Sequence, residues 1–352
     1  MAALPPKPPT LAEIARSAGV STATVSRVIK ARGYVADATR ARVAAVLRDT
    51  SYRPNALASG LRAQRSFSIG LVVPAITSNP FFVNVAHGVE EEGLRHGCKT
   101  MIFNHNGDEA LERYGVDRFL ERRVDALLIC NATAAGNVEA AMAAGVPVVQ
   151  IERETRARSM AVLADNHLGA SQAMARLIGL GHRRIAFIGG DPALLPYSGP
   201  QPLSVEEQRL AAYREAVDAA GIVARPDYVR IGPYFEMPQG SGRAGREAMD
   251  ALLTLDERPT AVFATCDVLA AGVLQSLHAA RLRVPDDVSL IGFDDTLAIN
   301  LAPALTTVAQ PMQRMGAEAV RLAMAALAGA AEPRTVTLPT WVIDRDSTAP
   351  PS

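Results

Sequence analysis

Two kinds of hydrophobic spacing divide the chain into a short first part and a long second part. Within the first fifty residues, apolar residues recur at intervals of three and four, which predicts three short helices over Leu11–Ser17, Thr22–Ile29 and Asp37–Asp49. From Phe67 onward, short β-branched apolar runs alternate with alanine-rich stretches of helical period. That alternation is typical of parallel sheets covered by helices. The pattern therefore predicts a small all-α domain followed by a larger α/β domain.

Capping signals mark the starts of the first two helices. Thr10 precedes the first helix and Glu13 is its third residue, which is the spacing of a capping box, and Ser21 stands where it would cap the second helix. The Ala36 side chain cannot accept a capping hydrogen bond for the third helix, but the neighbouring Asp37 could cap it instead. Two short helices joined at a glycine form a helix-turn-helix, which places its second helix in the major groove of DNA. A plain helical hairpin gives the same pattern.

Charge is unevenly distributed along the chain, although its formal net charge is +0. The segment up to Ser66 contains eleven Lys and Arg residues against three Asp and Glu, a net charge of +8, and the remainder carries −8. A basic first segment is expected when that end of the protein meets phosphate. A solvated basic face would have the same composition.

The α/β part divides into two similar series of strands and helices. Strands are expected at 68–73, 125–129 and 146–151 in the first lobe and at 184–189, 261–264 and 289–293 in the second. Helices are expected near 82–96, 110–121 and 138–144, and then near 167–180, 206–220, 242–253 and 269–279. In open parallel sheets, ligands bind at the carboxyl ends of the strands, so the loops after these strands form the candidate site in a cleft between two lobes.

These patterns set the expected domain boundaries. The helix-turn-helix domain covers 1–52, a hinge and linker cover 53–66, and the two-lobed domain covers 67–352. Lobe one is expected to contain about 67–162 and 309–330, and lobe two about 163–308 and 331–352. Pro54 suits the first turn of a hinge helix that is too short to be stable alone and is expected to fold on DNA.

The segment TLAEIARSAGVSTATVSRVIK, followed by YRPNALASGLR, resembles the head and hinge of the lactose-repressor and galactose-repressor family. The similarity continues to Ser347. The resemblance implies a helix-turn-helix domain with a hinge helix, followed by a two-lobed α/β domain like a periplasmic binding protein, with parallel sheets flanked by helices.

The resemblance also implies a set of DNA-contacting residues. Thr22 and Ala23 match the family's main base-reading positions, and Leu61 matches the leucine that enters the minor groove at the operator centre and kinks the duplex. Leu61 is otherwise an ordinary hydrophobic helix residue. Lys30 departs from the common asparagine, and Gly60 weakens the hinge helix. The other candidate DNA-binding residues are Thr10, Ser21, Thr24, Ser26, Arg27, Lys30, Tyr34, Asn55 and Ala58.

A second set of residues matches the family's effector site. Arg209 in EEQRLAAY and Asp294 in IGFDD correspond to a paired arginine and aspartate that suit hydroxyl-rich sugars or other polar metabolites. A structural salt bridge between them is the alternative. Tyr234 or Phe235 corresponds to the ring that stacks on the ligand, and the longer segments 191–206 and 233–241 border the expected cleft. The remaining candidates are Asn79, Phe81, Phe82, Asn131 and Cys266.

Signals for catalysis are weak. Residues Gly240 to Gly245 spell GxGxxG, but they follow a polar loop instead of a strand, and the six histidines show no HExxH spacing. The three cysteines are far apart in apolar surroundings and are expected in the core. We therefore expect no cofactor, no metal and no enzymatic activity. The α/β part could also belong to a periplasmic-type sugar-binding protein or to a sugar-transforming enzyme. The basic N-terminal segment argues against the first alternative, and the lack of a catalytic motif argues against the second.

Taken together, the sequence predicts a sequence-specific DNA-binding transcriptional regulator. We expect a repressor that binds a near-palindromic double-stranded operator and responds to a sugar-like effector held between its lobes. A homodimer is expected, since no leucine heptads of the kind that join the lactose repressor into a tetramer follow Ser347. The chain has no apolar run of about 18 residues and no secretory signal at its start, so a cytoplasmic location without membrane contact is expected.

Overall fold

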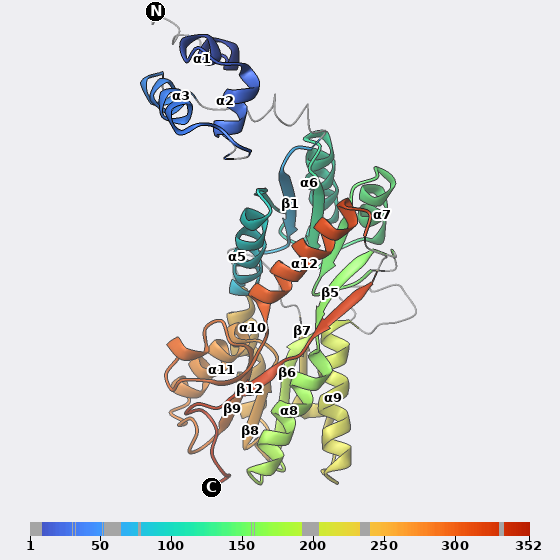
Figure 1. Cartoon of the computed structure of the whole chain (residues 1–352). Coiled ribbons are helices and arrows are strands. Elements are labelled where there is room, and N and C mark those ends of the chain that lie inside the picture. The colour runs from blue at the N-terminus through green and yellow to red at the C-terminus, as the bar shows by residue number, and fades with distance from the viewer. Residues whose placement is uncertain are drawn as a thin grey trace, which may run out of the picture. The chain divides into compact units, whose positions relative to one another are not determined.

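The computed structural model of the chain forms two compact units, residues 1–66 and 67–352 (Figure 1). The structure describes residues 9–29, 31, 33–50, 52, 65–76, 79–155, 157, 159–191, 204–232, 240–330 and 334–352. Each unit has its own hydrophobic core.

The first unit is a three-helix domain. Its helices are α1 (Leu11–Ser17), α2 (Thr22–Ile29) and α3 (Asp37–Asp49), as predicted. The capping box of α1 is confirmed, because Thr10 and Glu13 exchange both hydrogen bonds. The buried core is small and consists of Ile14, Ala15, Ala18, Val25 and Val43.

Asp37 does not cap α3. Ala36 is the N-cap residue and makes no side-chain capping bond, while Asp37 is already the first helical residue. There its negative charge complements the positive end of the helix dipole without capping a backbone amide. The Arg42 side chain ties α3 to α1 instead, since its Nε donates to the Ala18 carbonyl at 2.8 Å.

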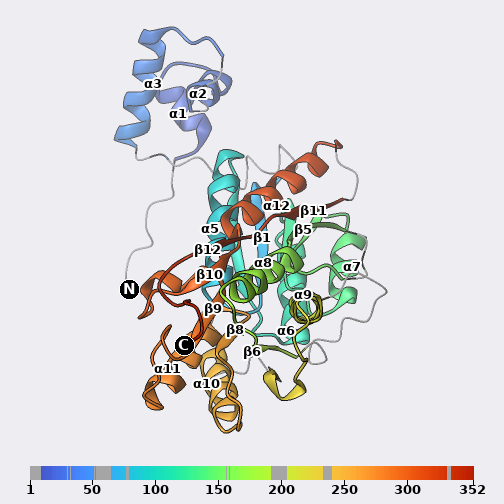
Figure 2. The ribbon, with the colours of Figure 1, turned by 90° about the horizontal axis from the view of Figure 1, so that it is seen from below.

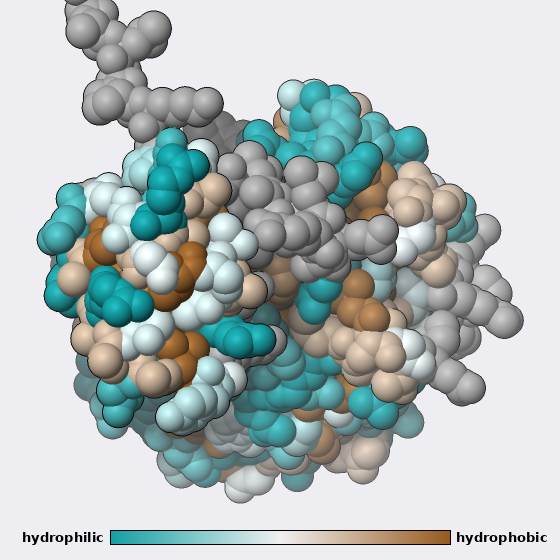
Figure 3. Space-filling view, turned by 45° about the horizontal axis from the view of Figure 1, so that its top comes forward, coloured by the Kyte–Doolittle hydropathy of each residue, from teal (hydrophilic) through white to brown (hydrophobic). Residues whose placement is uncertain are grey.

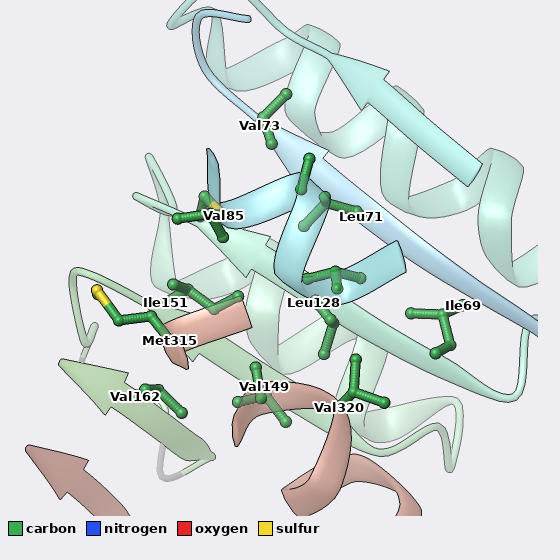
Figure 4. Packing of buried hydrophobic residues seen from close by; sticks show 14 of the residues in the cluster. Ile69, Leu71, Val73, Val85, Leu128, Val149, Ile151, Val162, Met315 and Val320 are labelled. Carbon is green, nitrogen blue, oxygen red and sulfur yellow. The ribbon is translucent and has the colours of Figure 1, made fainter. Parts of the chain in front are cut away.

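The first lobe of the larger unit is built on a six-stranded parallel sheet in the order β11-β5-β4-β3-β1-β2. Its strands are β1 (Ser68–Val73), β2 (Lys99–Asn104), β3 (Ala126–Cys130), β4 (Val148–Ile151), β5 (Met160–Ala164) and β11 (Thr335–Leu338). Helices α5 (Pro80–Arg95) and α12 (Met312–Leu327) cover one face, and α6 (Glu109–Glu121) and α7 (Ala135–Ala143) cover the other. Figure 4 shows side chains from the strands, such as Leu71, Leu128 and Val149, packing against Val85, Met315 and Val320 of the first helix pair.

The second lobe repeats this layering on a sheet in the order β12-β10-β9-β8-β6-β7 (Figures 1 and 2). Its strands are β6 (Ile185–Gly190), β7 (Val229–Gly232), β8 (Ala261–Ala264), β9 (Ser289–Asp294), β10 (Thr306–Ala309) and β12 (Trp341–Ile343), the last antiparallel. Helices α8 (Asn166–Gly179) and α9 (Val205–Ala219) cover one face, and α10 (Gly240–Leu253) and α11 (Asp267–Ala279) the other. Short 3₁₀ helices lie at Pro226–Tyr228 and Ala298–Asn300.

The structure corrects the expected lobe boundaries. β5 extends lobe one to Ala164, and β11 pairs with β5 in the first sheet although 331–352 was assigned to lobe two. Only the chain from β12 onward returns to the second sheet. Strand β11 is short and half exposed, so its sequence does not indicate which sheet it joins.

Glycines explain how helix pairs approach closely in both lobes. A Cβ atom on Gly245 of α10 would lie 2.1 Å from the Leu269 carbonyl of α11, and one on Gly272 would lie 1.9 Å from the Gly242 carbonyl. In lobe one, Gly88 of α5 meets α12 in the same way, 2.0 Å from a backbone oxygen. Gly242 and Gly245 of the GxGxxG stretch therefore serve backbone contact between two helices.

The three cysteines are buried, as predicted. Cys98 and Cys130 belong to the core of lobe one, and Cys266 belongs to that of lobe two. Within the described residues, no helix has the length and apolar character needed to cross a membrane. On the face shown in Figure 3, hydrophobic side chains lie among hydrophilic ones.

Candidate functional site

The first candidate site is the start of α2 in the helix-turn-helix unit. Thr22, Ala23 and Arg27 are exposed, while Val25 on the opposite side of the same helix is completely buried. The core thus fixes the direction of α2 and leaves its N-terminal residues free to meet a duplex. This arrangement is the one that a recognition helix requires.

Two candidate DNA-contacting hydroxyls already have a structural role. The Ser21 Oγ accepts from the Thr24 backbone amide at 3.1 Å and lies 3.0 Å from the Thr24 hydroxyl. The Thr10 hydroxyl is engaged in the cap of α1, and Tyr34 is 91% exposed. The predicted contacts Lys30, Asn55, Ala58 and Leu61 lie outside the described residues.

The second candidate site is a group of polar residues, most of them buried, at the carboxyl ends of strands from both sheets. We call it the interlobe cluster. The first lobe contributes residues that follow β3 and β4, and the second contributes residues from α8, α9 and the ends of β8, β9 and β10. Because the carboxyl ends of parallel strands lie at one edge of a sheet, the residues that follow these strands lie close together. The cluster consists of Asn131, Glu152, Arg153, Asn166, Glu206, Arg209, Thr265, Cys266, Asp294 and Gln310.

Arg209 is held rigidly within the interlobe cluster. Its Nε and Nη2 donate to Asn166 Oδ1 at 3.0 and 2.7 Å, and its Nη1 donates to the Thr265 carbonyl at 2.6 Å. The guanidinium carbon lies 3.8 Å from the centre of the Phe293 ring. All these partners are uncharged, so the positive charge of Arg209 has no ion-pair partner within 4.0 Å among the described residues. The alternative of a direct structural salt bridge to Asp294 is therefore not formed.

Two carboxyl groups, those of Glu152 and Asp294, lie close enough to Arg209 for its positive charge to lower their pKa values. Burial raises the pKa of Glu152 to about 7, against the lowering effects of Arg209 and Arg153. Burial also raises the pKa of Asp294 well above its usual range, with Arg209 opposing the rise and Asp267 and then Glu152 adding to it. Asp294 accepts a hydrogen bond from Gln310 Nε2 at 2.7 Å. Both groups thus resist ionisation although a cation is near.

Backbone strain marks the same strand ends. Asn131, Glu152 and Asp294 have φ values of 47°, 71° and 108°, in the left-handed region that residues with side chains rarely adopt. Each such residue costs on the order of 1 kcal/mol, and strained residues concentrate at ligand sites. The strain supports a binding role for the carboxyl ends of β3, β4 and β9.

An ion pair links the two lobes. The Arg153 Nη2, directly after β4 in lobe one, lies 3.1 Å from Glu206 Oε2 at the start of α9 in lobe two. Both side chains are more than nine-tenths buried. Separating a buried pair of this kind is costly, so it couples the end of β4 in lobe one to the start of α9 in lobe two.

The remaining predicted effector residues occupy several environments. Asn79 caps α5 by accepting from the Phe81 amide at 3.0 Å. Phe81 and Phe82 are each 1% exposed and share a core cluster with Cys130, the last residue of β3. Cys266 caps α11, where burial and the neighbouring Asp294 raise its thiol pKa. The predicted stacking residues Tyr234 and Phe235 lie outside the described residues.

Several members of the interlobe cluster were not predicted from the sequence. Glu152 and Arg153 follow β4, Asn166 follows β5 and Gln310 follows β10. The rule that selected Asn131 and Asp294, polar residues after a strand, also selects Glu152 and Arg153 after the predicted strand 146–151. It selects Asn166 and Gln310 only once β5 and β10 are recognised as strands. Glu206 joins the cluster only through the fold, because it begins a helix.

Comparisons with known proteins agree with this architecture. Residues 10–55 match the model for bacterial regulatory proteins of the lacI family, and residues 174–348 match that for a periplasmic binding protein-like domain. The ribose operon repressor of Escherichia coli strain K12 is 35% identical over 315 residues, which is 88% of this chain and 91% of the repressor. The chain belongs to the lacI family. The expected fold, a helix-turn-helix domain followed by a two-lobed α/β domain, is confirmed.

Solved structures of other lacI-family proteins show the same fold. The lac repressor dimer bound to operator and the anti-inducer ONPF has a TM-score of 0.81 at 25% identity, over 97% of this chain and 100% of that one. A LacI family transcriptional regulator from Enterococcus faecium with bound ribose has a TM-score of 0.69 at 27% identity, over 81% of this chain and 100% of that one. Both proteins and the E. coli repressor are regulators of transcription.

Proposed function

We propose that this lacI-family regulator is a repressor that binds a near-palindromic operator as a homodimer and is controlled by a sugar bound at the interlobe cluster. The observation that carries the proposal is Arg209, a buried cation held entirely by uncharged groups, beside two carboxyl groups at the strand ends of both lobes. Fixed donors and acceptors of this kind match the hydroxyls of a sugar. The ribose-bound relative from E. faecium and the ribose operon repressor of E. coli support the ligand class.

Operator recognition is assigned to the exposed start of α2. Thr22 and Ala23 would meet base edges, and Arg27 would contact guanine or phosphate. One helix-turn-helix covers one half-site, so two copies related by a two-fold axis would read a near-palindrome, as the lac repressor dimer does on its operator. In the hinge, Asn55, Ala58 and Leu61 are proposed to meet the operator centre.

Control by the effector is assigned to a change in the orientation of one lobe relative to the other. A ligand that engages Glu152 in lobe one and Arg209 in lobe two contacts both sides, as the Arg153–Glu206 pair already does. A ligand that stabilises one orientation of the lobes over another would change the position of the segments that lead to the helix-turn-helix unit. A coupling free energy of about 1 to 3 kcal/mol suffices for control.

Catalysis is not part of the proposed function. Operator binding implies a cytoplasmic location. An operator is chromosomal DNA, so the protein must reside where that DNA is. The glycine motif that resembles a dinucleotide site is explained by the α10–α11 contact.

The test is selection of duplexes from a random pool by the full-length protein, followed by fluorescence anisotropy of the best site with and without ribose and other sugars. We expect a near-palindromic site with a Kd below about 0.1 μM that is displaced by, or tightened by, one sugar. A variant with Thr22→Ala and Arg27→Ala serves as the control and should lose the preference. Weak binding that is indifferent to sequence and sensitive to salt would refute operator recognition.

A further inference from the structure

The chain passes between the two lobes at three short crossovers in the part that the structure describes. The first is Asp165, between β5 and α8, the second is Gln310 with Pro311, between β10 and α12, and the third is Pro339 with Thr340, between β11 and β12. None is longer than two residues. A change in the orientation of the lobes must therefore be taken up by the backbone at these crossovers.

The first and third crossovers are bonded to each other. The Asp165 backbone N–H donates to the Leu338 carbonyl at 2.9 Å, and the Thr340 hydroxyl donates to the Asp165 carbonyl at 2.8 Å. The Thr340 side chain is buried. These two crossovers should therefore move together.

A side-chain amide next to the first crossover holds Arg209. Asn166 is the first residue of α8, directly follows Asp165 and is buried. Its Oδ1 accepts from both Nε and Nη2 of Arg209, at 3.0 and 2.7 Å, and its Nδ2 donates to the carbonyl of Ala164, the last residue of β5, at 3.1 Å. Asn166 thus links a cation on α9 of lobe two to the end of a strand in lobe one.

A side-chain amide in the second crossover holds Asp294 in the same way. The Gln310 Nε2 donates to Asp294 Oδ1 at 2.7 Å, and the Gln310 backbone N–H donates to the Asp294 carbonyl at 3.4 Å. Gln310 is buried, and its Oε1, like Glu152 Oε2 at the end of β4, has no hydrogen-bond partner. Each of the two charged groups expected to bind the effector is therefore held by an amide side chain at a crossover.

We propose that Asn166 and Gln310 are positioning residues through which a ligand bound to Arg209 and Asp294 changes the geometry of the crossovers. The proposal rests on the proposed function and concerns the regulation of that same site. Arg209 uses three of its five N–H donors on Asn166 and on the Thr265 carbonyl, so two are left for a ligand. A ligand that shifts the guanidinium also shifts the Asn166 side chain, because two hydrogen bonds join them, and the backbone of Asn166 adjoins the first crossover.

The first experiment needs no ligand and measures the distance between the lobes in the full-length protein. Spin labels are attached at Glu139→Cys in α7 of lobe one and at Val223→Cys in lobe two, both exposed positions, while the three natural cysteines are buried. Labelled chains are diluted with unlabelled chains, so that pulsed electron resonance reports distances within one chain. We expect one narrow distance in the reference protein and a broader or displaced distribution in Asn166→Leu and in Gln310→Met, which keep the side-chain size but lose the hydrogen bonds.

Two further variants separate this role from a loss of stability. Thr307→Val removes a buried hydrogen bond of 2.7 Å to Asp267 within lobe two and should keep the narrow distance. Asn166→Asp retains an oxygen that accepts from Arg209 and should keep it as well. A distribution that is unchanged in both Asn166→Leu and Gln310→Met, or that broadens equally in Thr307→Val, overturns the proposal. If Asn166→Leu does not fold, Gln310→Met decides.

The second experiment measures control of operator binding with ribose as the probe. Calorimetry gives the ribose affinity of each variant, and fluorescence anisotropy gives its operator affinity without ribose and with ribose at saturation. We expect ribose to change the operator affinity of the wild type at least about fivefold, and that of Asn166→Leu and Gln310→Met less than about twofold, although their sites are filled. A full response in both variants at saturation overturns the proposal. If the wild type binds no operator or does not respond to ribose, the proposed function fails, and the distance measurement still decides this inference.

Discussion

The helix-turn-helix unit and the two-lobed unit place their candidate site residues in opposite environments. In the first, Thr22, Ala23 and Arg27 are exposed above a small apolar core, whereas in the second Arg209 and Asp294 are buried among hydrogen-bond partners. DNA is large and brings its own charge to an exposed surface, while a small ligand must be surrounded to be bound tightly. Substitutions in the first site should therefore change affinity alone, and those in the second should change affinity and folding together.

The largest effect is expected for Arg209→Ala. The variant removes three buried hydrogen bonds and the cation that faces Glu152 and Asp294. We expect effector affinity to fall at least about a hundredfold, roughly 3 kcal/mol, with operator affinity in the absence of effector retained. Titration of the operator complex with effector measures this.

The matched control for that variant is Arg214→Ala, an exposed arginine on the same helix. It should respond to effector like the wild type. Equal loss of operator binding and effector response in Arg209→Ala would contradict the separation of the two sites.

Glu152→Gln should change how stability depends on pH. A carboxyl whose folded pKa is raised from 4.5 to about 7 contributes full stability below its unfolded pKa and loses it as the pH rises through about 7. The variant cannot ionise, so it should be more stable than the wild type at alkaline pH, by on the order of 2 kcal/mol, and show little gain in acid. Urea unfolding at a series of pH values measures the free energy of unfolding of both proteins. A constant difference between the variant and the wild type at every pH would contradict the prediction.

Val25→Ala tests the small core of the helix-turn-helix unit. Val25 is completely buried against α1 and α3, so the variant should lose about 2 kcal/mol of that unit's stability. Operator binding should weaken as the unit unfolds, while effector affinity stays constant. Calorimetric unfolding and both titrations measure this. Val223→Ala, at a side chain 84% exposed in the larger unit, is the control.

The smallest effect is expected for Arg27→Ala. An exposed side chain contributes nothing to the core, so folding should be unchanged and operator affinity should fall about tenfold, roughly 1.4 kcal/mol. Arg48→Ala, an exposed arginine on α3, should have less effect. Fluorescence anisotropy over a series of salt concentrations, repeated with altered operator sequences, distinguishes two kinds of contact. If Arg27 contacts a phosphate, the dependence of operator affinity on salt becomes smaller in the variant. If Arg27 contacts a base, the variant loses its preference at one base pair. An unchanged affinity would remove Arg27 from the interface.

The sequence by itself determined the elements whose signals are local. The bounds of α1 and α2 match their predictions, because the capping residues Thr10 and Ser21 lie next to the helices that they start. Strands β1 and β8 also match, since each is an unbroken apolar run buried on both faces. The family resemblance added Arg209 and Asp294, both of which lie in the interlobe cluster.

Only the tertiary structure decided what depends on neighbours that are distant in the chain. Strands β2, β7, β11 and β12 were missed because they are partly exposed and lack the continuous apolar run of a central strand. Strands β5 and β10 were missed although they are buried. The Arg153–Glu206 pair and the unpaired oxygen of Glu152 were missed as well. Which carboxyl group faces which guanidinium is fixed by the packing of two separate sheets, and no local pattern of residues encodes that distance.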